Sequence, residues 1–113
     1  MSSALGSSDI LTPGQSLVSP NNAFIATLQG DGNLVVYRIG NSHALWASNT
    51  VNKGGIKLIM QEDGNLVLYT ANGQAVWASN TAGTGDSFAR MQNDGNFVVY
   101  TQGKPTWATG TNQ

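Results

Sequence analysis

The strongest constraint on the fold of this chain is an internal repeat. Three ten-residue blocks resemble one another: LQGDGNLVVY at 28–37, MQEDGNLVLY at 60–69 and MQNDGNFVVY at 91–100. Each block is followed by a tryptophan in the related endings WASNT, WASNT and WATGT. A unit of about 31 residues cannot bury its own apolar face. The repeat therefore predicts three units, at about 20–50, 51–81 and 82–111, packed around one shared centre.

Composition and periodicity both indicate an all-β chain. Glycine (14) and asparagine (12) make up 26 of the 113 residues, and both favour tight turns with positive φ. In several five-residue segments, apolar and polar residues alternate or β-branched residues predominate, as is typical of strands. No segment of 11 residues or more keeps apolar residues at the spacing of a helix. A chain of this length forms one domain. Residues 1–8, mostly Ser, Ala and Gly, are expected to be poorly ordered.

The second repeat predicts the local geometry. Alternation places five apolar side chains on the core face: Ile56, Leu58, Met60, Leu66 and Leu68. Pairing Met60 with Leu66 on that face requires a three-residue loop, 62–64, whose Gly64 is left-handed. The dipeptide Asn72-Gly73 then predicts a two-residue hairpin that sets Trp77 opposite Leu68.

Each repeat is thus predicted to be a three-stranded meander, and three such sheets would form a three-sided prism. Its axis would be filled by the tryptophans Trp46, Trp77 and Trp107. A sugar-stacking role for one of them at the surface is the alternative interpretation.

The opposite face of the second repeat carries a polar set. Gln61, Asn65, Val67 and Tyr69 share it, with Asp63 at the tip of the loop, and the turn makes Gln61 and Asn65 cross-strand neighbours at roughly 5 Å. Two amides, a carboxylate, a phenol and an apolar methyl pair suit a polyol with one C–H face, which indicates a monosaccharide. A turn alone needs only Asp or Asn with Gly. All three blocks nevertheless keep the spacing Gln-x-Asp-x-Asn-x-Val-x-Tyr. This favours a binding site over a turn whose flanking residues have no function of their own.

This pattern resembles the site motif of the monocot mannose-binding lectins, also called bulb-type lectins. The resemblance covers about 90 of the 113 residues, including the WASNT endings. It implies a β-prism II fold with three mannose sites, in which Asp and Asn bind the axial 2-hydroxyl, Gln the 3-hydroxyl and Tyr the 4-hydroxyl, while Val packs against the ring carbons. The implied carbohydrate-binding residues are Gln29, Asp31, Asn33, Val35 and Tyr37; Gln61, Asp63, Asn65, Val67 and Tyr69; and Gln92, Asp94, Asn96, Val98 and Tyr100.

The expected ligands are mannose, mannosides and mannose-rich glycans, bound by a cysteine-free, single-domain member of this family. The plant members carry an internal disulfide, which this chain cannot form because it has no cysteine. Family members often dimerise by exchanging the C-terminal strand, and residues 108–113 are long enough for that. The resemblance therefore also implies a homodimer.

Charge and hydropathy restrict partners and location. Five Lys+Arg against six Asp+Glu leave a net charge of −1, so nucleic acid is not an expected partner. No apolar run approaches the ~20 residues of a transmembrane segment, and the start MSSALGSSDI lacks the features of a secretory signal. The cytoplasm, non-classical export and a mature secreted form all stay open.

Other function classes fit the sequence less well. The one histidine, His43, lies in a loop-like stretch, and only the second repeat has adjacent carboxylates, Glu62 and Asp63, where glycoside hydrolysis needs a pair at every site. No catalytic residue and no cofactor is therefore expected. Only one acidic residue is common to all three loops, and calcium usually needs several carboxylates among its six to eight oxygen ligands. No metal ligands are therefore expected, and binding should not depend on calcium. A protein-interaction or structural module, including a bacteriocin-like cell-targeting role, is the alternative function.

Overall fold

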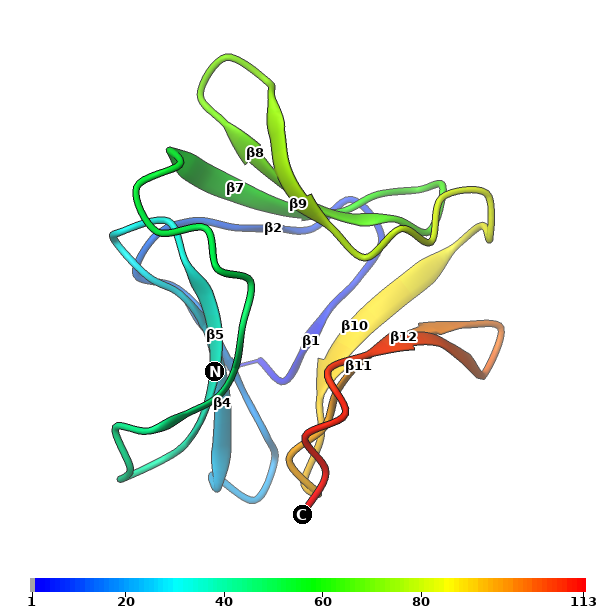
Figure 1. Ribbon diagram of the computed structural model, residues 1–113. Coiled ribbons are helices and arrows are strands. Elements are labelled where there is room, and N and C mark those ends of the chain that lie inside the picture. Colours follow the sequence, from blue (N-terminus) through cyan, green and yellow to red (C-terminus); the bar gives the residue numbers. More distant parts are fainter. Residues whose placement is uncertain (1) are drawn as a thin grey trace.

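The structure, a computed structural model, describes residues 2–113. It contains twelve strands in three four-stranded antiparallel sheets that form the sides of a triangular prism (Figure 1). The first sheet consists of β3 (Ser16–Val18), β4 (Phe24–Leu28), β5 (Leu34–Arg38) and β6 (Ala44–Ala47). The second consists of β2 (Ile10–Leu11), β7 (Gly55–Met60), β8 (Leu66–Thr70) and β9 (Ala75–Ala78). The third consists of β1 (Ala4–Leu5), β10 (Ser87–Met91), β11 (Phe97–Thr101) and β12 (Lys104–Ala108).

The predicted central hairpin is confirmed. Met60 pairs with Leu66, and the Gln61 N–H donates to the Asn65 carbonyl at 2.9 Å, which leaves a three-residue loop. Gly64 has φ +93°, and a Cβ there would lie 1.9 Å from Thr84 Oγ1. Both the backbone conformation and the close approach therefore demand glycine at this position.

Two local expectations are wrong because strands bulge. The register of β7 shifts between Gly55 and Lys57, so Ile56 leaves the core face and is 38% exposed. The Asn72-Gly73 connection is a three-residue loop closed by Thr70 N–H to the Gln74 carbonyl (2.9 Å), not a two-residue turn. A compensating shift between Leu68 and Tyr69 restores the predicted pairing of Leu68 with Trp77.

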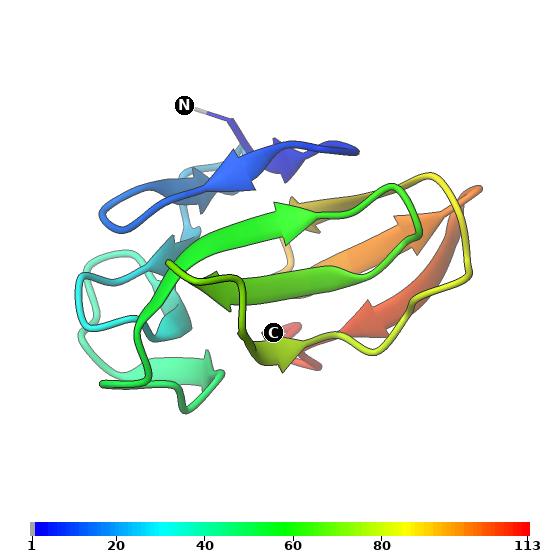
Figure 2. The same ribbon diagram turned by 90° about the horizontal axis from the view of Figure 1, so that it is seen from above.

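Each three-stranded meander gains a fourth strand from the start of the chain. Strands β1, β2 and β3 pair with β10, β7 and β4, so residues 4–18 contribute one strand to each of the three sheets (Figure 2). Leu5, Leu11 and Leu17, six residues apart, each point a buried side chain into the core. Residues 2–8 therefore do not form the poorly ordered end that was expected, while Met1 lies outside the described residues.

The core is arranged in layers along the prism axis. The tryptophans pack against one another edge to face, with ring centroids 5.3–5.5 Å apart, which confirms their packing role. They are only half-buried, and they lie on β6, β9 and β12, at the opposite edge of each sheet from β3, β2 and β1. The indoles thus fill the prism axis at one of its ends, and the three N-terminal leucines close the other end. Between them lie fully buried side chains such as Leu34, Leu66 and Phe97.

Candidate binding site

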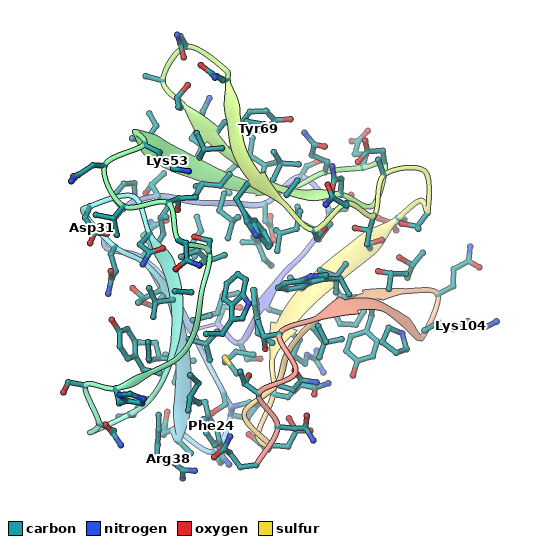
Figure 3. All side chains as sticks on the ribbon, in the orientation of Figure 1. Phe24, Asp31, Arg38, Lys53, Tyr69 and Lys104 are labelled. Atoms are coloured by element: carbon teal, nitrogen blue, oxygen red, sulfur yellow. The ribbon has the colours of Figure 1, made fainter. Side chains whose placement is uncertain are left out.

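Each sheet carries the same five-residue constellation around the loop that joins its two middle strands. We call these constellations site I (Gln29, Asp31, Asn33, Val35, Tyr37), site II (Gln61, Asp63, Asn65, Val67, Tyr69) and site III (Gln92, Asp94, Asn96, Val98, Tyr100). Figure 3 labels Asp31 of site I and Tyr69 of site II, both on the periphery of the prism. The structure therefore brings together, within each sheet, the residues that the sequence predicted to act together.

The glutamine and tyrosine of each site are joined to each other. In site I the Gln29 Nε2 donates to the Tyr37 hydroxyl oxygen at 2.5 Å, and the same pairs form in the other two sites. Both side chains are half-buried. Because the carboxamide nitrogen is used in this contact, the carboxamide oxygen remains able to accept a hydrogen bond and the phenol hydrogen remains able to donate one.

The aspartate lies exposed at the tip of the loop. In each site its Oδ1 accepts the backbone N–H of the asparagine two residues later, at 2.9–3.0 Å. Its Oδ2 makes no hydrogen bond within the described part of the chain. One carboxylate oxygen thus stabilises the loop while the other is an open acceptor for a ligand hydroxyl.

The asparagine contributes to both structure and site. In site II the Asn65 Oδ1 accepts from the Ser79 hydroxyl and from the Thr81 N–H, each at 3.2 Å. The Thr81 hydroxyl in turn donates to the Gly64 carbonyl at 2.6 Å. Since the side-chain oxygen is occupied by the protein, only the Nδ2 group of the asparagine is available to a ligand, as a donor.

Sequence reasoning missed this second function of the WASNT endings, which it used only as a mark of the repeat. Residues Asn49, Asn80 and Gly110 have φ of +59°, +61° and +72°, and they turn the chain so that the next threonine reaches the loop. The signal was present, because a residue type that tolerates positive φ precedes a threonine in all three endings.

The valine of each site is deeply buried. Alternation puts it on the same strand face as the tyrosine, but Val35, Val67 and Val98 are only 1–3% exposed. Each forms a recessed floor between the Gln–Tyr pair and the loop. Little of the apolar surface of these valines is therefore exposed.

Together the groups of each site form a set of directed hydrogen-bonding donors and acceptors. One carboxylate oxygen, one amide donor, one amide acceptor and one hydroxyl converge around an apolar floor, a set suited to hydroxyl groups on a ring. Among residues 2–113 no three His, Cys, Asp or Glu side chains gather to hold a metal ion. No helix in this part of the chain is long and apolar enough to span a membrane.

Comparison with known sequences gives partial matches. No family model matches the chain. It is 46% identical over 65 residues to the B-type lectin plumieribetin of Scorpaena plumieri, a match covering 58% of this chain and 55% of that protein. It is 42% identical over 70 residues to a mannose-specific lectin of Narcissus pseudonarcissus, covering 58% of each. The chain thus spans little more than half the length of the curated relatives that it matches.

Solved structures match along nearly the whole chain. A monomeric monocot mannose-binding lectin from Gastrodia elata is 38% identical, with a TM-score of 0.89 over 99% of this chain and 100% of that one. The mannose-specific agglutinin of snowdrop, Galanthus nivalis, solved with methyl α-D-mannoside, is 37% identical, with a TM-score of 0.79 over 98% of both chains. The chain therefore belongs to the monocot mannose-binding, or bulb-type, lectin family, as a cysteine-free member, and its fold is the β-prism II.

Proposed function

We propose that the chain is a non-catalytic lectin that binds α-D-mannose and mannose-rich glycans at up to three sites, one on each sheet. The observation that carries this proposal is the intact set of five residues in all three sites. If some of these residues were replaced, a module that uses the prism to bind a protein would be favoured instead. We further propose that residues 1–113 form one lectin domain of three repeats, 20–50, 51–81 and 82–111.

The proposed roles follow from the groups left available in each site. The aspartate Oδ2 accepts from the axial 2-hydroxyl, and the asparagine Nδ2 donates to the same oxygen. The glutamine Oε1 accepts from the 3-hydroxyl, the tyrosine hydroxyl donates to the 4-hydroxyl, and the valine contacts the ring carbons. No step of this recognition uses a metal ion, so we expect a calcium chelator to leave mannose binding unchanged.

A single site of this kind is weak. A few hydrogen bonds, each contributing about 0.5–1.5 kcal/mol net, correspond to a millimolar affinity, roughly −4 kcal/mol, after a small ligand has been ordered. Several sites on one particle raise apparent affinity about 10² to 10⁴-fold on a surface dense in mannose. Cross-linking of mannose-rich glycans is therefore the proposed activity.

We also propose a homodimer formed by exchange of the C-terminal strand. Strand β12 pairs with β11 of the same chain. A tight turn joins the two strands, and Gln102 and Gly103 in this turn both have positive φ. Opening this turn would let β12 make the same contacts with a second copy. Light scattering coupled to size-exclusion chromatography tests the assembly, since a monomer at all concentrations would contradict it.

The test of the function is a calorimetric titration with methyl α-mannoside against methyl α-glucoside. These sugars differ only at the 2-hydroxyl, which the aspartate and asparagine should recognise. We expect binding of the mannoside at up to three sites per chain and no comparable binding of the glucoside. If neither sugar binds, the protein-interaction or structural module becomes the better account.

A further inference from the structure

Site I adjoins an open cavity that its tyrosine helps to form. The cavity has a volume of about 360 Å³ and is lined by Ile25 and residues 37–42, which include Tyr37. The register places Ile25 opposite Tyr37, and the Ile39 N–H donates to the Ala23 carbonyl at 2.8 Å. Ile25, Tyr37 and Ile39 therefore share the outer face of the first sheet, with Ile39 beyond the tyrosine on the side away from the binding loop.

The walls of this cavity are mainly apolar. Ile39 is 45% exposed and Ile25 is half-buried, so both present aliphatic surface next to the tyrosine. Arg38 also lines the cavity, but its guanidinium carbon lies 5.1 Å from the centroid of the Phe24 ring and its Nη2 donates to Gln113 Oε1 at 3.0 Å (Figure 3). The charge is thus held on the side of Phe24, and none of the lining residues is acidic.

The loop after β5 forms one wall and is held by hydrogen bonds of its own. The Asn41 N–H donates to the Arg38 carbonyl at 3.0 Å, and Gly40 between them has φ +87°. The Asn41 Oδ1 accepts the His43 N–H at 2.9 Å. The wall is therefore fixed by the chain itself, and it offers few side-chain acceptors for the hydroxyl protons of a second sugar.

The other two repeats have different residues at the positions of the two isoleucines. Opposite the site tyrosine stand Ile25 in the first repeat, Lys57 in the second and Phe88 in the third. Two positions after the tyrosine stand Ile39, Ala71 and Gln102. An isoleucine therefore occupies both positions only beside site I.

The proposed roles orient the sugar relative to this cavity. Asp31 binds the 2-hydroxyl, Gln29 the 3-hydroxyl and Tyr37 the 4-hydroxyl, so the sugar ring runs from the loop toward the tyrosine. Carbon 6 is attached next to carbon 4 and lies at the tyrosine end, whereas the anomeric oxygen lies next to carbon 2 at the loop end. None of the proposed hydrogen bonds uses the 6-oxygen, so a substituent on it leaves all of them intact.

We propose that site I prefers a mannose whose 6-oxygen carries an apolar chain, such as an acyl or alkyl group, which lies in this cavity. The proposal deepens the proposed function and rests on it. Because Gln29 Nε2 donates to the Tyr37 hydroxyl, the ring leans toward the loop and stands between the sugar and the two isoleucines. Successive outward side chains on a strand are roughly 7 Å apart, so a chain of about six carbons can cross the ring and contact Ile25 and Ile39.

The test isolates site I with the double variant D63A/D94A, which disables the other two sites. Two isomers are compared, methyl 6-O-hexyl-α-mannoside and hexyl 6-O-methyl-α-mannoside, which differ only in the end of the sugar that carries the hexyl chain. Binding is followed by NMR at the Asn33 backbone amide and at the methyl groups of Ile25 and Ile39. We expect the 6-O-hexyl isomer to bind about tenfold more tightly, as burial of roughly two methylene groups would give, and to shift the signals of both isoleucines.

Variants of exposed isoleucines assign the preference to the cavity. I39Q introduces the residue of site III, and the affinity ratio of the two isomers should fall to about two or less. I10A removes an isoleucine of similar exposure, 47%, from the second sheet and should keep the preference. A preference that is the same in I39Q as in its parent would overturn the proposal.

A second sugar is the other occupant to test. The ligand is a disaccharide with glucose joined to the 6-oxygen of methyl α-mannoside, so that only one of its rings is a mannose. We expect it to bind site I more weakly than the 6-O-hexyl isomer, because the cavity walls are mainly apolar. Tighter binding of the disaccharide would show that the cavity accepts a sugar and that the proposal is wrong.

The outcomes distinguish this inference from the proposed function. If methyl α-mannoside binds site I but the two isomers bind equally, this inference fails and the lectin function stands. If methyl α-mannoside binds none of the sites in the unmodified chain, both fail.

Discussion

The side-chain oxygen of Asn65 accepts a hydrogen bond from the backbone N–H of Thr81, at 3.2 Å and across 16 residues of chain. This contact ties the end of a repeat back to the loop at its centre, and equivalent contacts join Asn33 to Thr50 and Asn96 to Thr111. The loop geometry that presents each aspartate therefore depends on the ending of its own repeat, WASNT in the first two and WATGT in the third.

Removal of the Thr81 hydroxyl should weaken both stability and site II. Thr81 is buried, and its hydroxyl donates to the Gly64 carbonyl, so T81V leaves a buried acceptor without its donor. We expect a loss of about 1–2 kcal/mol in the free energy of unfolding, measured by urea denaturation, and weaker mannoside binding at site II than at site I. The control is T27V, because Thr27 makes only a 3.5 Å contact. Equal losses in the two variants would contradict the role of Thr81.

Substitution of Asp63 should abolish one site and leave the fold intact. D63A removes a charged acceptor from an exposed position, while Gly64 still forms the turn. We expect at least a tenfold loss of mannoside affinity at site II, on the order of 1.4 kcal/mol or more. Because the exposed bond from the Asn65 N–H to Asp63 Oδ1 is also lost, the free energy of unfolding should fall, but by no more than about 1 kcal/mol. The neighbouring variant E62Q removes a charge from the same loop and should bind normally. Undiminished binding by D63A at site II would refute the assigned role.

Truncation of one tryptophan should destabilise the whole prism. Trp77 contacts the rings of both Trp46 and Trp107, so W77A opens a void at one end of the core. We expect a loss of about 3 kcal/mol in the free energy of unfolding, the lower end for a large aromatic residue because the indoles are half-buried. W77F should cost less. A loss below about 1 kcal/mol for W77A would show that the cluster is not part of the core.

The N-terminal leucines should matter for stability, although they lie on strands of only two or three residues. Leu11 is 5% exposed, whereas its neighbour Ile10 is 47% exposed. L11A should therefore cost about 2–4 kcal/mol and I10A less than about 1 kcal/mol, measured by thermal or urea unfolding. Similar small effects of both changes would mean that the N-terminal strands contribute little to the fold.

Gly55 should resist even the smallest enlargement. A Cβ at this position would lie 2.9 Å from the Leu68 side chain, in a core layer where the other two repeats have Phe24 and Ser87. G55A is expected to lower stability by about 1–3 kcal/mol through overpacking. Gly30 is the matched control, because a Cβ there would meet nothing within 4 Å and its φ is not positive. If G30A and G55A are equally stable, Leu68 must be able to move aside.

Much of the fold and of the candidate sites could be predicted because the determining contacts are local. The parity of Met60 and Leu66 selects a three-residue loop, and the same parity sets Gln61, Asn65 and Tyr69 on the other face. Repetition of this pattern three times then predicts a closed arrangement of three sheets. The bulge at Ile56 escaped this reasoning, because a strict alternation cannot show where one strand carries an extra residue.

The sequence by itself thus determined the three hairpins, the motif on their outer faces and the inward tryptophans, since each follows from spacing within about 20 residues of chain. Only the tertiary structure decided which sheet receives each N-terminal strand and how far the indoles are buried. A strand of two residues is too short to show an alternation of apolar and polar residues in the sequence. Its partner strand is determined by how the three sheets close into the prism. Asn65 shows the same limit, because its side-chain oxygen is assigned to Thr81 only once the ending of the repeat has folded back.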